Sequence, residues 1–566
     1  MLRAVMVVLI AVVITPWPLN AARAADVHAW FVDSLVKVFP ADAPGAHRLA
    51  SAEYWGARNQ HVSVQLALRS GKAFQGITVQ VKPLFEKGAT ESRAIEVHHV
   101  GYVVAGSHTP DSPPDELVGV APGWYPDVLE EFPFDLKPDW TVPIWITIHI
   151  PEEAHPGVYR GAIQVRAKGK LIARNRFVLH VVAARVPQAR TLHVTNWFSL
   201  NDDVSRQFYG VPMFSPAWWK LLANVGRVLA DYRQNVALTP LMTLIQPRID
   251  DGRLSYDYAN FDRWVETLQQ AGVIGTIEGS HLTTRAQGAY QGSLMVPILE
   301  ITNNAVQQIT VPAGDPRVVP FLTSFLSQLA SHLKEKGWTH SYVQHISDEP
   351  HGPEMPFYVK FAAIVHQSMP GVRTIDAVDL AHITEDLRKS CDIWVPILGS
   401  FDGSLNLIRQ HVQEGHAVWY YTCISPEGRY LNRFLDFPLV KTRLLPWLDF
   451  RYGLTGFLHW GGNDWTPKPM LDTQPVINDN QTLLPPGDAF IVYPDRAHLS
   501  VKASIRLEAL RAGIEDYEML RILQSRNPAE AREISHSAIS SFTGYVRDAR
   551  QFRRIERQLL RALSEK

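Results

Sequence analysis

The run Tyr342-Val343-Gln344-His345-Ile346-Ser347-Asp348-Glu349-Pro350 decides the expected fold, because an apolar strand-like stretch ends in two acids and a proline. Successive side chains of a strand point to opposite faces, so neighbouring carboxylates serve one pocket only where the strand ends and the backbone turns outward. Pro350 favours such an ending, since it has no N–H and biases Glu349 toward an extended conformation. The pattern is typical of a catalytic strand end in an α/β barrel.

Other apolar, strand-like runs surround this one and alternate with helical patterns, such as 216–234 and 316–336. Including the first run, they begin near Leu192, Val236, Val273, Ser341, Arg373, Cys391, His416 and Leu454. Eight strand–helix units are the number that a (β/α)8 barrel requires. The sequence therefore predicts a catalytic (β/α)8 TIM-type barrel over residues 189–500, with C-terminal helices over 501–566 packing on it.

The first part of the chain has the two-residue period of β-strands instead. Apolar side chains alternate with polar ones over 62–68 and again over 144–150, which indicates half-buried strands. Lys168-Gly169-Lys170 separates two further strand patterns, 162–167 and 171–182, as a hairpin turn would. We therefore expect an antiparallel β-sandwich over residues 25–188, closed by Pro187.

The N-terminus has the features of a signal peptide. Arg3 precedes an apolar run over 4–14, and Ala22-Arg23-Ala24 fits the small-residue pattern before a cleavage site. Residues 1–24 are thus predicted to be removed after export to the periplasm or the extracellular space. No later segment approaches the roughly 20 apolar residues that a transmembrane helix needs.

Composition limits the classes of partner. The chain has 566 residues, a net charge of −1 and a pI of about 7.1. Neither a basic field for nucleic acid nor an acidic tail is present, so nucleic acid is not an expected partner. Only two cysteines occur, Cys391 and Cys423; one bridge is conceivable, although their expected positions at opposite ends of successive strands argue against it.

Polar and aromatic residues follow several of the predicted strands, at the end where barrel enzymes place their sites. Such a rim suits a sugar, because aromatic faces stack on a pyranose and polar groups fix its hydroxyls. The candidates for substrate binding are Glu278, His281, His345, Tyr420, Tyr421, Trp460 and Asn463.

Asp348 and Glu349 are the catalytic candidates, although an Asp-Glu dipeptide is usually a solvated surface feature. Ordinary glycosidases place two carboxylates on opposite sides of the scissile bond, roughly 5 to 9.5 Å apart, and immediate neighbours fit that geometry poorly. Adjacent acids fit substrate assistance better: a 2-acetamido group attacks its own anomeric carbon, one carboxylate orients its N–H, and the other acid protonates the leaving oxygen. Proximity would also push the two pKa values apart.

Several segments together resemble glycoside hydrolase family 123. They are 123–127 (GWYPD), 156–161 (PGVYRG), 347–350 (SDEP), 456–465 (GFLHWGGNDW) and 506–518 (RLEALRAGIEDYE). The resemblance implies a β-sandwich followed by a catalytic barrel, and a β-N-acetylgalactosaminidase acting through substrate assistance. It also implies that Asp348 polarises the acetamido group, that Glu349 is the general acid/base, and that Trp460 and Asn463 lie in the sugar pocket, with Tyr420 and Tyr421 as further candidates.

Three alternatives remain beside this hypothesis. His345, Asp348, Glu349 and His351 contain metal-ligand types, but no second histidine cluster completes a site, and we expect no metal and no cofactor. A retaining glycosidase with a separate nucleophile would need a carboxylate on the seventh or eighth strand, and none precedes Asp464. A non-catalytic carbohydrate-binding protein would not need two acids at one strand end.

The expected function is therefore release of a terminal β-linked N-acetylhexosamine, N-acetylgalactosamine above all, from a glycan or glycoconjugate, with retention through an oxazolinium intermediate. Glu515, Asp516 and Glu518, in a helical pattern with Arg506 and Arg511 upstream, are expected to form structural surface or inter-helix ion pairs. The residues favour no particular oligomeric state.

Overall fold

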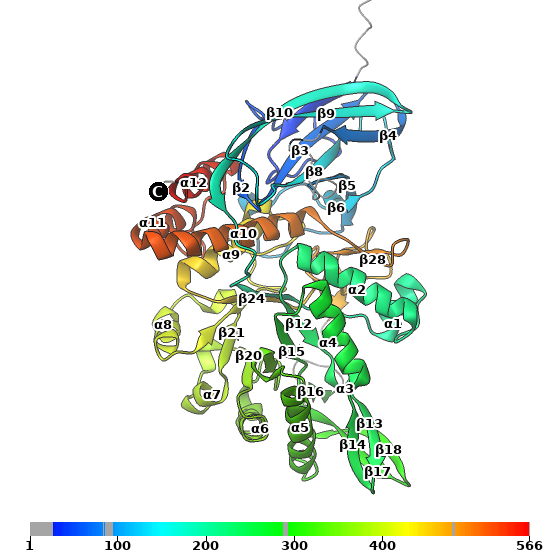
Figure 1. Cartoon of the computed structure of the whole chain (residues 1–566), viewed down its shortest axis with the longest axis vertical. Helices are drawn as coiled ribbons and strands as arrows, with labels where there is room; N and C mark the ends of the chain where they lie inside the picture. Colours follow the sequence, from blue (N-terminus) through cyan, green and yellow to red (C-terminus); the bar gives the residue numbers. More distant parts are fainter. Residues whose placement is uncertain (1–26, 83, 85–93, 287–291, 478–480, 565–566) are drawn as a thin grey trace, which may run out of the picture.

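The computed structural model describes residues 27–82, 84, 94–286, 292–477 and 481–564. The expected signal peptide, residues 1–24, lies outside the described residues. Figure 1 shows a β-rich N-terminal part above a larger part in which strands and helices alternate, with helices α9 (Leu439–Tyr452) and α10 (Ile505–Arg526) between them.

The N-terminal part consists of two five-stranded sheets that share an apolar core. Side chains such as Val64, Ile146 and Ile163 fill this core, so the predicted two-residue alternation is confirmed. Pairing is antiparallel except that β2 runs parallel to β10, which corrects the expectation of purely antiparallel sheets. One sheet has the order β1 (Val27–Val32), β3 (His61–Ser70), β8 (Val142–His149), β5 (Ile95–Ala105), β6 (Gly123–Glu130); the other has β2 (Glu53–Arg58), β10 (Lys170–Arg185), β9 (Gly157–Ala167), β4 (Phe74–Val81), β7 (Phe134–Leu136).

The predicted hairpin joins β9 to β10. Lys168 has φ of 46° and Gly169 has φ of 81°, so both loop residues adopt the left-handed conformation of a tight two-residue hairpin turn. Glycine takes this conformation without a steric penalty, and it lets the chain reverse between Ala167 and Lys170, which pair directly.

Each of the eight predicted runs in the second part contains parallel strand structure. The strands lie in two sheets. The six-stranded sheet has the order β12 (Val236–Thr239), β15 (Thr276–Gly279), β19 (Tyr342–Gln344), β20 (Arg373–Val378), β21 (Ile393–Pro396), β22 (Ala417–Val418), and the three-stranded sheet has β11 (His193–Asn196), β24 (Gly456–His459), β23 (Tyr420–Tyr421).

Helices alternate with these strands and lie around them in Figure 1. They are α2 (Pro216–Asp231), α4 (Ala259–Ala271), α5 (Val318–Glu335), α6 (Met355–Ser368), α7 (Glu385–Ser390), α8 (Leu405–Gln413) and α9. Pro216 opens α2 as its first residue, where its missing N–H costs nothing, and the Ser215 hydroxyl caps the helix. Within the described residues, no helix combines the length and the apolar character that crossing a membrane requires.

Smaller elements decorate this scaffold. Two hairpins, β13 (Gln246–Asp250) with β14 (Arg253–Asp257) and β17 (Leu294–Thr302) with β18 (Ala305–Pro312), project from one end of the molecule (Figure 1). The sequence patterns did not predict them. The other short strands and α-helices are α1 (Asp202–Val204), α3 (Leu241–Leu244), β16 (Thr284–Arg285), β25 (Val476–Ile477), β26 (Thr482–Leu483), β27 (Tyr493–Asp495) and β28 (Ser500–Lys502).

Helix α10 connects the two parts through buried charges. Arg506 forms an ion pair of 2.8 Å with Asp127 on β6, and Glu508 accepts hydrogen bonds from Ser63 (3.0 Å) and Thr147 (3.1 Å) in the N-terminal sheet. Glu515 lies 2.6 Å from the His61 ring. Asp516 forms the expected inter-helix ion pair, with Arg443 on α9 (2.7 Å). The charges of this helix are structural, as expected, but they are buried rather than at the surface, and several reach the N-terminal sheet.

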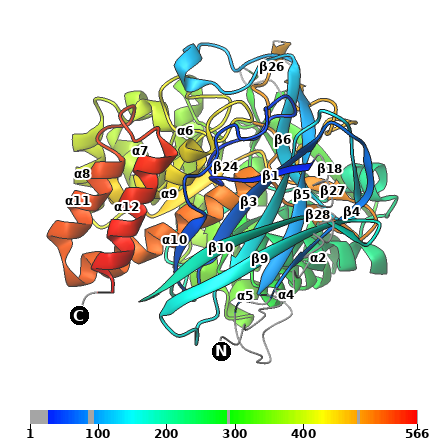
Figure 2. The same cartoon turned by 90° about the horizontal axis from the view of Figure 1, so that it is seen from above.

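Two further helices, α11 (Pro528–Ala538) and α12 (Ala549–Ala562), complete the chain and lie beside the N-terminal sheets when the molecule is viewed from above (Figure 2). The two cysteines do not pair: Cys391 is buried just before β21, and Cys423 follows β23. The argument against a bridge from their expected strand positions is therefore confirmed.

Candidate active site

The acid pair Asp348–Glu349 lies in the segment that follows β19 and precedes α6. Asp348 is exposed and Glu349 is half-buried. Glu349 has φ of 44°, a left-handed conformation that is uncommon outside glycine, so the extended conformation expected from Pro350 is wrong. The chain turns sharply at this residue.

Arg285 on β16 holds this turn from the opposite side. Its Nη2 donates hydrogen bonds to the backbone carbonyls of Asp348 (3.0 Å) and Glu349 (3.2 Å). The same guanidinium forms an ion pair of 2.9 Å with the buried carboxylate of Glu354. The His351 ring also lies 2.9 Å from the Glu349 carbonyl. These contacts fix the backbone of both acids and offset the cost of the left-handed conformation.

Tyr421, at the end of β23, contacts the acid pair directly. Its hydroxyl donates a hydrogen bond to Oε1 of Glu349. Burial, together with the nearby negative charge of Glu349, raises the pKa of Tyr421 well above its usual value. The phenol therefore keeps its proton at physiological pH and acts as a hydrogen-bond donor to Glu349.

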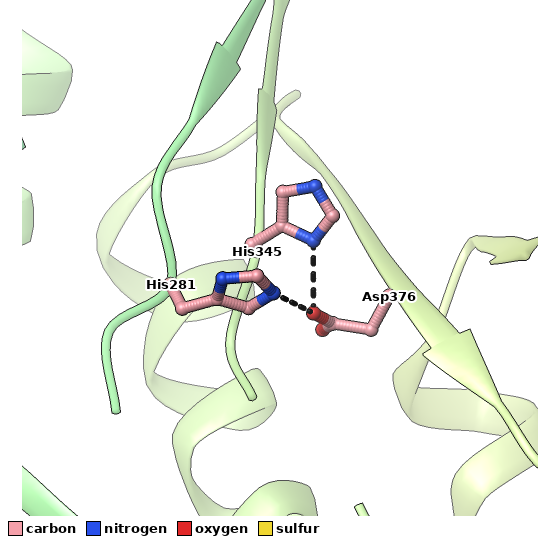
Figure 3. Close-up of side chains that lie close together, drawn as sticks. All are labelled: His281, His345 and Asp376. Carbon is pink, nitrogen blue, oxygen red and sulfur yellow. Dashed lines mark hydrogen bonds and ion pairs between the residues drawn. The ribbon is translucent and has the colours of Figure 1, made fainter. Parts of the chain in front are cut away.

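Behind the pair lies a buried histidine between two carboxylates. His345 Nε2 is 2.8 Å from Glu278 Oε1. On the other side of the ring, Nδ1 is 3.0 Å from Asp376 Oδ1, as Figure 3 shows. Burial alone would lower the pKa of His345, but the two carboxylates overcome it and raise the pKa to about 10. The Trp197 indole (2.8 Å) and the Thr195 hydroxyl (2.9 Å) also donate to Glu278. His345 is thus a fixed imidazolium.

This positive charge acts on Asp348. The surrounding protein removes much of the water near the Asp348 carboxyl and raises its pKa, although part of its surface reaches solvent. The positive charges of His345 and Arg285 oppose that shift. Burial is the larger effect, so the pKa of Asp348 stays above its ordinary value, and the carboxylate is ionised once the pH exceeds that raised pKa.

His281 lies next to this network and remains neutral. Burial and the nearby charge of His345 lower its pKa to about 3. Its ring centroid is 4.5 Å from that of His345, and its Nε2 is 3.7 Å from Asp376 Oδ1. Trp197 packs edge-on against both histidine rings. The group formed by Trp197, His281, His345, Glu278 and Asp376 is a polar, aromatic layer behind the acid pair.

His281, His345 and Asp376 offer ligand atoms within 4.8 Å of one another, which is close enough to consider a metal (Figure 3). Both nitrogens of His345 already face carboxylates, so the imidazole has no lone pair to offer an ion. The two histidines that the sequence offered as ligands, His345 and His351, do not point to a common position either. His345 contacts Glu278 and Asp376, and His351 contacts the Glu349 carbonyl. The donor set fits a hydrogen-bonded network better than a cation site.

With this geometry in place, the chain can be compared with known proteins. The family model described as glycoside hydrolase 123, catalytic domain, matches residues 197–523. The chain belongs to glycoside hydrolase family 123. The model of the family 123 N-terminal domain matches residues 41–167 in addition. The chain is therefore a glycosidase with a β-rich N-terminal domain and a catalytic domain.

A solved structure of a family 123 glycoside hydrolase from Clostridium perfringens, studied for glycolipid glycan hydrolysis, has the same fold. It matches with a TM-score of 0.73 at 16% identity, over 95% of this chain and 97% of that chain. A family 39 glycoside hydrolase from Bacteroides cellulosilyticus matches with a TM-score of 0.38 at 10% identity, over 82% and 81% of the two chains, and adds nothing to the argument. No curated protein matches the chain.

The other residues predicted for the sugar pocket of this family 123 chain differ in where they point. Trp460 is half-buried, and its indole donates to Asp488 (3.2 Å). Tyr420 is buried and donates to the Leu445 carbonyl (2.8 Å). The Asn463 side-chain amide forms two hydrogen bonds with the Ser199 backbone, both of 2.8 Å: Nδ2 donates to the carbonyl, and Oδ1 accepts from the N–H. Tyr420 and Asn463 thus have structural contacts and present no free polar group to a substrate.

Three residues beside the acids were missed in the sequence. Asp376 was detectable, because it is the one acid inside the apolar strand β20 (Arg373–Val378). Arg285 gave no signal, since it follows no predicted strand. Asp488, in the loop after β24, is the partner of Trp460; burial raises its pKa to about 7 against the opposing charge of Arg433.

Proposed function

We propose that this glycosidase releases a terminal β-linked N-acetylhexosamine, and we assign N-acetylgalactosamine as the sugar, by a retaining, substrate-assisted mechanism. The observation that carries the proposal is the adjacency of Asp348 and Glu349 at one strand end, with Tyr421 hydrogen-bonded to Glu349. Two neighbours cannot lie on opposite sides of a glycosidic bond, whereas both can serve one side of a sugar whose own acetamido oxygen attacks from the other.

In the first step, the acetamido oxygen forms a bond to the anomeric carbon while the bond from that carbon to the leaving oxygen breaks. Glu349 gives its proton to the leaving oxygen, and Asp348 accepts a hydrogen bond from the acetamido N–H and balances the positive oxazolinium. In the second step, water attacks the anomeric carbon and Glu349 takes the proton from it. The oxazolinium ring opens and the acetamido group is restored, so configuration is retained.

The electrostatics support these roles. Asp348 must be ionised to balance an oxazolinium; burial raises its pKa, and the positive charges of His345 and Arg285 oppose that rise and so favour the ionised state. The Tyr421 phenol keeps its proton and donates to Glu349. Trp197, Trp460 and His281 supply aromatic surface and polar edges suited to a pyranose.

We take the two sheets of the catalytic domain as arcs of one (β/α)8 barrel. Backbone hydrogen bonds between strands support this reading: the Trp419 amide donates to the Trp394 carbonyl (2.9 Å), and the Asn235 amide donates to the Val194 carbonyl (3.2 Å). The acid pair would then lie at the carboxyl end of the fourth strand. The relative from C. perfringens makes a glycolipid glycan a reasonable natural substrate, and we propose that the enzyme acts outside the cytoplasm after removal of residues 1–24.

The decisive experiment compares nitrophenyl β-glycosides of N-acetylgalactosamine, N-acetylglucosamine and galactose. Only the two acetamido sugars should be cleaved, with the galactosamine derivative preferred, because galactose has no internal nucleophile. Asp348→Asn and Glu349→Gln should each lower kcat by about 10²- to 10⁴-fold, the usual range for a positioned acid or base. Asp250→Asn and Glu335→Gln, matched changes at exposed sites, should retain activity.

A separate enzymic nucleophile would produce a different result. In that case plain galactoside would be turned over at a comparable rate, and a thiazoline mimic of the oxazolinium ion would fail to inhibit. Strong inhibition by the thiazoline, together with loss of activity in both acid variants, is the result that the proposal requires.

A further inference from the structure

A large cavity lies away from the acid pair, between the N-terminal sheets and helix α12. Its volume is about 1070 Å³, at the upper end of the roughly 300–1,000 Å³ of most ligand pockets. Residues of β2 and β3, of the loop before β2 and of α12 line it. None of the residues assigned above to the acid site is among them.

The lining of this cavity is strongly basic. Eight lysine and arginine side chains line it against three acids, Asp33, Asp548 and Glu556. Asp33 and Glu556 are already neutralised by Arg553, at 3.0 Å and 2.9 Å. Arg443 pairs with Asp516 (2.7 Å) and Arg547 pairs with Asp115 (2.8 Å), while burial lowers the pKa of Lys37 to about 7. The positive charge of the cavity therefore comes mainly from Arg48, Arg550, Arg554 and Arg557.

Helix α12 contributes half of these basic residues. Arg550, Arg553, Arg554 and Arg557 recur at the spacing that places side chains on one face of a helix. Among the residues that the structure describes, no acid lies within ion-pair distance of Arg550, Arg554 or Arg557. Arg550 and Arg554 are exposed, so their guanidinium groups are accessible, and a bound anion would relieve the weak repulsion between like charges at this spacing.

Two polar groups in the same lining also lack partners within the described residues. The Tyr54 hydroxyl and the Trp55 indole N–H are both buried and form no hydrogen bond. The Trp55 ring is stacked on His180, with centroids 4.3 Å apart, which fixes its orientation. Both donors are closed off from solvent, so the arginine side chains, rather than these two groups, offer the contacts that a ligand in the cavity can reach.

We propose that this cavity binds an anionic oligosaccharide, through sugar carboxylate or sulfate groups, separately from the acid pair. Guanidinium groups match the paired oxygens of carboxylates and sulfates, and the cavity is large enough for several sugar rings. The site extends the proposed function, because it would hold a remote acidic part of a glycan without taking part in cleavage. Its occupancy does not depend on the mechanism assigned to Asp348 and Glu349.

The test measures binding by isothermal titration calorimetry at 0.15 M salt, with the full chain carrying Glu349→Gln to prevent turnover. The probes are a chondroitin 4-sulfate tetrasaccharide, its unsulfated counterpart and neutral N-acetylchitotetraose. We expect the anionic probes to bind and the neutral one to bind at least 10-fold more weakly. Binding of the unsulfated probe alone would assign the recognition to carboxylates, and tighter binding of the sulfated probe would assign it to sulfate as well.

Substitutions locate the binding. Arg550→Gln combined with Arg554→Gln should weaken the anionic probes at least 10-fold, whereas Arg521→Gln with Arg532→Gln, the same loss of charge at exposed sites, should change affinity less than twofold. Made in the wild-type background, the Arg550/Arg554 pair should leave nitrophenyl-glycoside turnover unchanged. No binding of either anionic probe, equal weakening by both pairs, or equal binding of the neutral probe would overturn the proposal. None of these binding results would change the outcome of the hydrolysis assays, so the proposed binding site and the proposed cleavage mechanism can be rejected independently.

Discussion

The hydroxyl of Tyr421 donates a hydrogen bond to Oε1 of Glu349. This bond joins the end of β23 to the turn after β19, two segments that are 72 residues apart in the chain. It fixes the rotamer of the proposed acid/base and places a donor at its carboxylate. Glu349 is therefore positioned by a neighbouring strand as well as by its own backbone.

Tyr421→Phe should lower kcat by about 10- to 100-fold, because the phenol stabilises the negative charge that develops on Glu349 as it gives up its proton, and a hydrogen bond to a charged group contributes roughly 1.5–3 kcal/mol. The change keeps the ring and its packing, so KM should change little, while Tm should fall modestly through loss of the hydrogen bond. Tyr430→Phe is the matched control, since the Tyr430 hydroxyl contacts exposed Asp402 instead (2.7 Å). Full activity in Tyr421→Phe would show that the hydrogen bond does not assist Glu349.

The raised pKa of Asp348 predicts the acidic limb of the pH profile. Catalysis needs the ionised carboxylate, so kcat/KM should fall as the pH drops through a value above the ordinary aspartate pKa of about 3.9. Arg285 opposes the rise in this pKa. Arg285→Gln should therefore move the limb to higher pH.

Profiles of kcat/KM between pH 3.5 and 8 test this prediction. Arg317→Gln, which removes an exposed guanidinium paired with Asp315, should leave the limb in place. A limb that stays fixed in Arg285→Gln would mean that another group controls the protonation step, whatever the change in overall rate.

The buried imidazolium of His345 predicts how stability changes with pH. Its pKa rises from 6.5 to about 10 on folding, so its stabilising effect is complete below pH 6.5 and is lost as the pH rises through about 10. The loss is at most about 1.4 kcal/mol per pH unit. His345→Gln should thus lower Tm strongly at pH 6 and much less at pH 10.

Thermal denaturation of the two proteins across this range gives the comparison, with His340→Gln, an exposed histidine, as the control. A Tm difference between His345→Gln and the native chain that stays constant from pH 6 to 10 would contradict a charged His345.

The ion pair of Arg506 with Asp127 predicts the strength of the contact between the domains. Both side chains are fully buried, and Tyr493 also donates to Asp127 (2.6 Å). Arg506→Gln leaves the carboxylate unpaired and should cost about 3–5 kcal/mol of stability. Tm measurements should show a large decrease, and the exposed Arg206→Gln variant should show almost none. Equal decreases in Tm for the two variants would mean that the buried ion pair between the domains stabilises the protein no more than an exposed pair does.

The sequence pattern predicted the strand ends, because each one combines an apolar run with a turn signal. It could not predict the direction of every side chain there. Tyr420 and Tyr421 are neighbours on one strand and so point to opposite sides, one to the Leu445 carbonyl in the core and the other to Glu349. Which of the two faced the acids depended on the tertiary structure.

The conformation of Glu349 was not predictable for a similar reason. A following proline favours an extended residue, but hydrogen bonds from Arg285 to the two acid carbonyls hold the chain in a left-handed turn. Arg285 lies 63 residues before Asp348, in a segment without a strand pattern. Local preference is outweighed here by contacts from remote parts of the chain.

The burial of charges along α10 has a consequence for how such chains can vary. Arg506, Glu508 and Glu515 find their partners on strands of the N-terminal domain. A truncated protein that begins after residue 188 would remove the partners Asp127 of Arg506 and His61 of Glu515 and would expose this face of the helix, so we expect it to aggregate or unfold. The catalytic domain therefore depends on the β-rich domain for its stability. Evolutionary loss of the β-rich domain would require compensating substitutions along α10.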